Sequence, residues 1–134
     1  MEISIHPSSM FGIMFLLHIF ADFTLHIGAR LDKFKQWRWW RKQIPAEKEG
    51  EWNMYKDDYK IALCIHSLQW ALVTCLPLIM CGGRLYMFIA IIHAVIHGII
   101  DDMKANWMRI NLIYDQFFHT VQVFVIWSTW LVFI

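Results

Sequence analysis

Four long stretches without charged residues divide the chain. Counting Asp, Glu, Lys and Arg as charged, these stretches hold 19, 23, 16 and 19 residues, at positions 3–21, 61–83, 85–100 and 116–134. A helix of about 20 apolar residues crosses the hydrocarbon core of a bilayer. Three of the stretches therefore have the length of a membrane span, and the third in chain order has it once its interfacial ends are included. The pattern predicts an integral membrane protein.

Cap and turn residues define the predicted helices. Ser8 or Ser9 is the expected N-cap of the first helix, Pro77 is a candidate bend in the second, and Gly82-Gly83 forms the turn into the third. The first stretch lacks a basic start and a small-residue cleavage site, so we expect a retained helix rather than a signal peptide. The sequence predicts one all-α membrane domain, residues 1–134, with four transmembrane helices at about 9–29, 59–80, 85–102 and 112–134 and a polar loop at 30–58.

Composition limits the class of protein, and the distribution of charge predicts its orientation in the membrane. Hydrophobic residues make up 58% of the chain and charged residues 17%, which excludes a soluble domain, a disordered chain and a disulfide-stapled secreted module. Eight of the 12 Lys and Arg residues lie in the polar loop. Short loops rich in Lys and Arg stay in the cytoplasm. We therefore expect a multi-pass protein of the cytoplasmic (inner) membrane with this loop inside and both termini outside.

The polar loop also contains a Trp-rich basic segment. Residues 37–42 read Trp-Arg-Trp-Trp-Arg-Lys, and indoles interleaved with cations are typical of a segment that lies on an anionic membrane surface. An ordinary aromatic belt and specific binding of lipid headgroups explain it equally well. We expect membrane lipid, and no nucleic acid, as a partner.

Nine titratable side chains lie inside the predicted helices, where a charge at the centre of a span costs about 2.5–3.5 kcal/mol. A spacing of four residues advances a helix by roughly 40°, so the polar residues of helices 1, 3 and 4 each form one stripe. With a rise of about 1.5 Å per residue, all nine lie in the cytoplasmic half of the membrane. They are His18, Asp22, His26, His66, His93, His97, Asp101, Asp115 and His119.

A shared depth on four helices favours one site over scattered polar residues. Imidazoles and carboxylates without thiolates are the ligand set of Zn²⁺, Mn²⁺ or Fe²⁺, and this number of ligands would allow two ions. The three cysteines all lie in the second stretch and are interpreted as packing residues. His66 is alone on its helix and is as consistent with hydrogen bonding to a ligand as with ligation. The sequence predicts a divalent metal site.

The polar residues around this site include candidates for catalysis. Lys104 could pair with a carboxylate, bind a substrate phosphate or reach the headgroups, and Gln116 could hydrogen bond to a ligand or a substrate. Together with Asp22, these are the predicted catalytic residues. His6 and Asp102 are expected to lie outside the site.

Three segments resemble an uncharacterised family of small bacterial and phage membrane proteins, classed only as a domain of unknown function. The family pattern is H-x-x-x-D-F, H-x-x-x-H-x-x-x-D-x-x-K and D-Q-x-x-H, which residues 18–23, 93–104 and 115–119 match. At His26 the pattern more often has Gln, which weakens the assignment of this residue as an obligatory ligand. More distantly, the chain is similar to membrane-bound metal-dependent hydrolases. The resemblance implies a fold and a site but no substrate.

The leading hypothesis is a metal-dependent hydrolase that acts on a phosphoester or related bond of an amphiphile at the cytoplasmic leaflet. Transport of protons or a divalent cation is an alternative, although the outer halves of the helices lack titratable residues. Haem held between histidines is another, although three Asp residues at the same level disfavour it. A phage-type structural or lysis-related membrane protein is the last alternative. A homo-oligomer is compatible with so small a chain.

Overall fold

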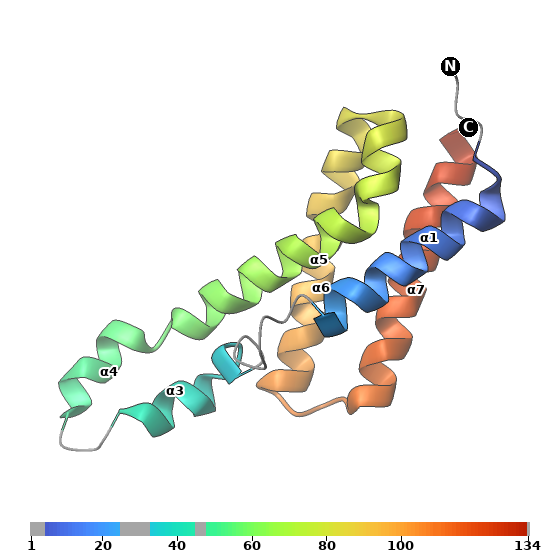
Figure 1. The fold of residues 1–134 in the computed structure, drawn as a ribbon. Helices are drawn as coiled ribbons and strands as arrows, with labels where there is room; N and C mark the ends of the chain where they lie inside the picture. The colour runs from blue at the N-terminus through green and yellow to red at the C-terminus, as the bar shows by residue number, and fades with distance from the viewer. Residues whose placement is uncertain (1–4, 25–32, 45–47, 134) are drawn as a thin grey trace.

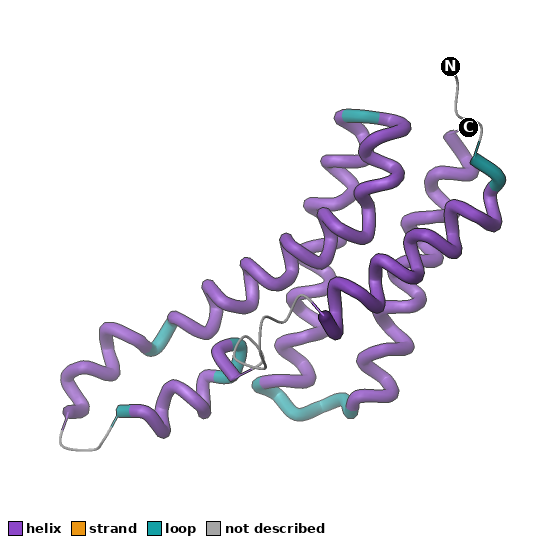
Figure 2. Tube along the Cα trace, viewed as in Figure 1, coloured by secondary structure: helices purple, strands orange, loops and turns teal. Residues whose placement is uncertain are grey.

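The computed structural model describes residues 5–24, 33–44 and 48–133, and all regular secondary structure within these ranges is helical (Figure 2). Helices α1, α5, α6 and α7 lie against one another as a bundle, and α3 and α4 extend from one end of it (Figure 1). We call this the α3 end of the bundle. The elements are α1 (Pro7–Ile19), the π-helix η1 (Phe20–Thr24), α3 (Trp37–Gln43), α4 (Glu49–Tyr55), α5 (Asp58–Gly82), α6 (Arg84–Ala105) and α7 (Leu112–Phe133).

Three helical stretches are long and apolar enough to cross a membrane: Gly50–Gly82, Arg84–Ala105 and Leu112–Phe133. The apolar helix Pro7–Phe23 is shorter, so a fourth crossing stays a prediction.

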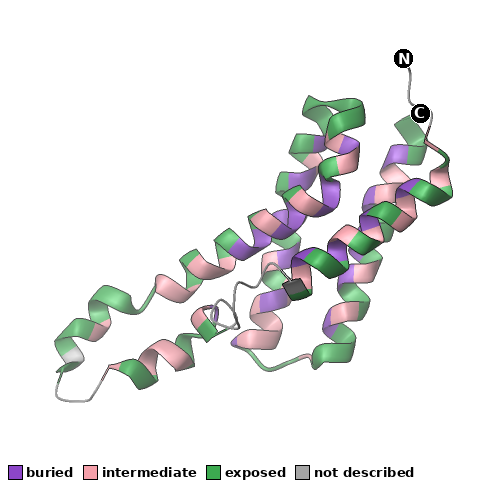
Figure 3. Ribbon diagram, in the orientation of Figure 1, coloured by how far each residue is buried: buried purple, intermediate pink, exposed green. Residues whose placement is uncertain are grey.

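The distribution of burial is that of a protein surrounded by lipid (Figure 3). On α6, the side chains of Phe88 and Val95 are 63% and 61% exposed, whereas His97 is fully buried. A soluble protein rarely exposes large continuous apolar surface, whereas here apolar residues cover much of the outside and polar residues such as His97 lie in the interior.

The first predicted helix differs from the observed one at both ends. It begins at Pro7 with His6 as the N-cap residue, because proline suits the first helical position. The prediction of Ser8 or Ser9 as N-cap was therefore wrong. At the other end the α-helix stops at Ile19 and continues as the π-helix η1. His26 and the rest of the predicted end of this helix lie outside the described residues.

The predicted polar loop contains the helices α3 and α4, and the segment that leads into α3 is fastened to the end of α6 by Asn106. The Asn106 side-chain oxygen accepts the backbone N–H of Trp37 at 2.9 Å. Its amide nitrogen donates to the Lys35 carbonyl at 2.9 Å and to Asp102 Oδ1 at 2.6 Å. Asp102 is thus half-buried and hydrogen-bonded, and Lys35 is held inside the bundle with only 6% of its surface exposed.

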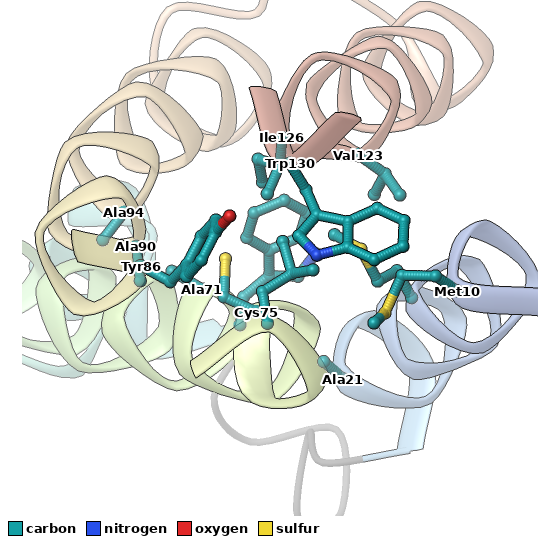
Figure 4. Packing of buried hydrophobic residues seen from close by; sticks show 13 residues of the cluster. Met10, Ala21, Ala71, Cys75, Tyr86, Ala90, Ala94, Val123, Ile126 and Trp130 are labelled. Atoms are coloured by element: carbon teal, nitrogen blue, oxygen red, sulfur yellow. The ribbon is translucent and has the colours of Figure 1, made fainter. Parts of the chain in front are cut away.

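Away from the α3 end, the helices enclose an apolar core (Figure 4). Met10, Val123 and Ile126 are fully buried there, with Cys75 of α5 and Tyr86 of α6 beside them. The turn between α5 and α6 is made at Gly83, whose positive φ of 64° favours glycine.

The start of α1 and the end of α7 lie at the same end of the bundle (Figure 1). The indole nitrogen of Trp127 donates to the carbonyl of Pro7 at 2.9 Å, which fastens the two helices there.

Candidate metal centre

Three histidines and three aspartates converge near the α3 end of the bundle. They form three groups, and within each group the potential ligand atoms all lie within 4.8 Å of one another. Any two groups share one residue, so the six side chains make one connected cluster. The three cysteines are free thiols outside these groups. The groups are Asp22, His66 and His97; His97, Asp101 and His119; and Asp22, Asp115 and His119.

The Nε2 atoms of His66 and His97 lie 3.2 Å apart. Asp101 approaches both, with Oδ2 at 3.1 Å from His66 Nε2 and Oδ1 at 3.7 Å from His97 Nε2. Two nitrogens bound tetrahedrally to one zinc ion at about 2.0–2.1 Å stand about 3.3 Å apart. The spacing between the imidazoles fits two ligands of one ion as well as a hydrogen bond between the rings.

A hydrogen-bond chain fixes the tautomer of His119. The Gln122 amide nitrogen donates to the backbone carbonyl of His93 at 3.0 Å, which leaves its side-chain oxygen to accept from His119 Nδ1 at 3.4 Å. With the proton on Nδ1, Nε2 of the neutral ring carries a lone pair. Such an outer hydrogen bond is the usual way in which proteins orient a metal-binding histidine.

His119 Nε2 faces two carboxylates. It lies 3.2 Å from Asp101 Oδ1 and 3.3 Å from Asp115 Oδ1. A lone pair directed at two carboxylate oxygens is repulsive unless a positive species, either a second proton or a metal ion, lies among them. Asp115 Oδ1 is buried and, in the part of the chain that the structure describes, has no hydrogen-bond donor. The residues therefore fit a metal ion.

Chain geometry explains why the carboxylates meet. Asp101 lies in the last turns of α6 and Asp115 in the first turn of α7, so the short connection between the helices brings both to the α3 end. Asp22 comes from η1, and π-helical turns are frequent at functional sites.

Two polar residues, Lys104 and Gln116, donate hydrogen bonds to the Oδ2 atoms of Asp115 and Asp22. Lys104 Nζ donates to Asp115 Oδ2 at 2.6 Å. Gln116 Nε2 donates to Asp22 Oδ2 at 2.5 Å and lies 3.3 Å from Asp115 Oδ2. Both predicted polar residues thus contact the cluster.

The predicted ligands His18 and His93 each direct a ring nitrogen to another side chain instead of to the cluster. The Nδ1 atom of His18 accepts the indole N–H of Trp70 at 2.9 Å, and that of His93 lies 3.3 Å from the Gln122 amide nitrogen. Neither belongs to a metal-compatible group among the described residues. His26 lies outside those residues, so six of the nine predicted ligands form the cluster.

Two residues of the site were missed by the sequence analysis. Lys35 Nζ donates to Asp101 Oδ2 at 2.7 Å, although nothing in the sequence distinguishes this lysine from the other basic residues of the polar loop. Trp70 stacks on His97 with ring centroids 4.1 Å apart and an interplanar angle of 14°. Its one sequence signal was its position four residues after His66, which places both on one helix face.

A pocket of about 380 Å³ opens beside Asp101, between the α3 segment and the end of α6. The pocket connects the Asp101 carboxylate to the protein surface, past the cationic side chains that line it. Its lining consists of Lys35, Gln36, Arg38, Asp101, Lys104, Ala105 and Met108.

No family model, curated protein or solved structure matches this chain. The residues of the site are therefore the basis for assigning its chemistry.

Proposed function

We propose that the protein is a membrane-embedded, metal-dependent hydrolase that cleaves a phosphoester or related bond of an amphiphile at the cytoplasmic leaflet of the inner membrane. The observation that carries the proposal is the position of His119 Nε2 within 3.3 Å of carboxylate oxygens of both Asp101 and Asp115, where a neutral imidazole nitrogen would repel them. A divalent Zn, Mn or Fe ion among these atoms would remove the repulsion. When bound, such an ion would also activate water and polarise a phosphoryl oxygen.

The pocket supports hydrolysis because it joins Asp101 to the surface.

Gln116 holds Asp22 Oδ2, and Oδ1 of the same carboxylate lies 3.8 Å from His66 Nε2. We assign Asp22 as the proton acceptor. Water adds to phosphorus as the ester P–O bond breaks, and the proton taken by Asp22 passes to the leaving oxygen. Lys104 neutralises charge at the edge of the pocket.

The apolar core argues for hydrolysis over transport. Beyond Gln122 and His93, the fully buried residues include Met14, Leu78 and Ile126, so the interior away from the α3 end is mainly apolar. A transported ion needs polar partners along its path. A site reached from one side is sufficient for an enzyme.

The direct test is metal content together with turnover. The purified full chain should bind Zn, Mn or Fe stoichiometrically and release phosphate or a headgroup from lipid vesicles. Chelation should stop release before the helices unfold, because the fold also rests on the apolar core. His97→Ala and Asp101→Ala should each lose bound metal, whereas His6→Ala should retain it.

Two results would contradict the proposal. Equal metal loss in the cluster variants and in His6→Ala would indicate general unfolding. Metal-dependent cation flux across vesicles, without product from any phosphoester, would favour transport.

A further inference from the structure

The pocket beside Asp101 combines a buried cation with two more accessible ones. Lys35 is nine-tenths buried, with its ammonium 2.7 Å from Asp101 Oδ2. The Lys104 side chain is 38% exposed, and its ammonium is 2.6 Å from Asp115 Oδ2. Arg38 donates one N–H to the sulfur of Met108, which is a weak acceptor. Three cations from two segments thus surround one cavity.

Donors remain for a ligand in this cavity. An ammonium has three N–H groups and a guanidinium has five. Lys104 directs one to Asp115, and Arg38 directs one to Met108. Arginine and lysine N–H groups bind phosphate oxygens through strong charge-assisted hydrogen bonds. The volume of about 380 Å³ falls within the range of about 300–1,000 Å³ for small-molecule sites, so it accommodates a phosphate with part of its ester group.

In the part of the chain that the structure describes, the Lys, Arg and Asp side chains of the pocket and the cluster carry equal and opposite charge. Lys35, Arg38 and Lys104 contribute three positive charges. Asp22, Asp101 and Asp115 contribute three negative charges, and histidines that bind metal are neutral. One divalent ion then leaves two uncompensated positive charges. Uncompensated charge at the edge of a low-dielectric bundle is unfavourable, and a dianion in the pocket restores neutrality among these groups.

We infer that this pocket binds the doubly charged terminal phosphate of a phosphomonoester, so that the substrate of the proposed hydrolase is a monoester and not a diester. The inference rests on the proposed function. A terminal phosphate carries a charge of about −1.5 to −2 at pH 7, whereas a diester carries a single charge. Only the monoester neutralises the metal-loaded site.

Binding of inorganic phosphate tests the pocket without turnover. Calorimetry with the full chain in detergent, loaded with one equivalent of Zn²⁺ or Mn²⁺, should show phosphate binding that is strongly weakened when the metal is removed. Arg38→Gln should weaken it by about 10-fold or more, because it removes a charged donor, and should leave metal content unchanged. Lys42→Gln is the matched control, since Lys42 is an exposed cation on the same helix.

Equal phosphate affinity in Arg38→Gln and the parent chain would overturn the inference. So would equal weakening in Arg38→Gln and Lys42→Gln, which would indicate general attraction to a basic surface.

Turnover separates this inference from the proposed function. Vesicles that contain phosphatidic acid, a monoester, should release phosphate, whereas phosphatidylglycerol, a diester, should remain intact. Cleavage of the diester as fast as the monoester would refute the monoester assignment and support the hydrolase. Phosphate binding weakened by Arg38→Gln, with no ester cleaved under any metal, would support the pocket and refute the hydrolase.

Discussion

At the scale of single residues, Gln122 decides which nitrogen of His119 faces the cluster. It donates to the His93 carbonyl and accepts from His119 Nδ1. Loss of this contact would free the ring to rotate and to change tautomer. The ligand atom and its neighbours would remain, but they would no longer be oriented before binding.

We expect Gln122→Leu to lower metal affinity by about 10- to 100-fold, the usual effect of losing the outer hydrogen bond of a metal-binding histidine. Competition with a chromophoric chelator measures it. Gln69→Leu is the matched control, because it makes the same change at a half-buried position of α5. Unchanged affinity in Gln122→Leu would remove the argument for His119 as an oriented ligand.

Part of the site follows from residue spacing alone. His97 and Asp101 are four residues apart on a regular helix, as are Asp115 and His119, so helical periodicity brings each pair together. Lys35 has no such signal: it reaches Asp101 across 66 positions of the chain. The hydrogen bond from Asn106 to its backbone carbonyl helps to hold it inward, and tertiary contacts of this kind have no pattern in a single sequence.

At the scale of helices, α5 and α6 approach closely at Gly98. A Cβ added at Gly98 would lie 2.8 Å from Ser67 Oγ. That hydroxyl cannot move without losing its hydrogen bond of 2.7 Å to the Leu63 carbonyl. Small residues at such contacts allow membrane helices to pack closely.

We expect Gly98→Ala to destabilise the bundle by about 1–3 kcal/mol, the usual effect of overpacking a close contact. Ser67→Ala in the same chain should restore stability, because the nearest carbon of Ser67 is at an ordinary distance of 3.6 Å. Unfolding in a denaturing detergent measures both.

Gly12→Ala is the control for this pair, since a Cβ there meets nothing within 4 Å. A loss of stability in Gly12→Ala equal to that in Gly98→Ala would contradict the close-contact explanation.

The last three helices follow from the long uncharged stretches that specify them. Their predicted ends, 59–80, 85–102 and 112–134, lie within three residues of the observed ones. The π-helix η1 was missed. Its five residues are Phe-Ala-Asp-Phe-Thr, and neither composition nor spacing distinguishes them from a continuing α-helix. His18 and Asp22 were predicted to lie on one stripe of a helix. In the structure His18 contacts Trp70, whereas Asp22 belongs to the cluster.

At the scale of the whole molecule, the two ends of the described chain lie together, away from α3. We expect a reporter fused after Ile134 to be external and one inserted near Lys48 to be cytoplasmic, because basic loops are retained inside. Alkaline phosphatase and green fluorescent protein fusions measure the two sides. Both reporters on one side would exclude three crossings by α5, α6 and α7, and the reverse orientation would refute a cytoplasmic site.

The Asn106 contact also has a consequence for the order of assembly. Asn106 follows Lys35, whose carbonyl it binds, by 71 positions, so the polar segment leaves the ribosome well before its anchor exists. During that interval the Lys35 ammonium can stay among lipid headgroups, as long cationic side chains do. Asp22 and His66 are likewise made before the partners that α6 and α7 supply. The first half of the chain is therefore synthesised before its partners, and the site can close only once α6 and α7 are present.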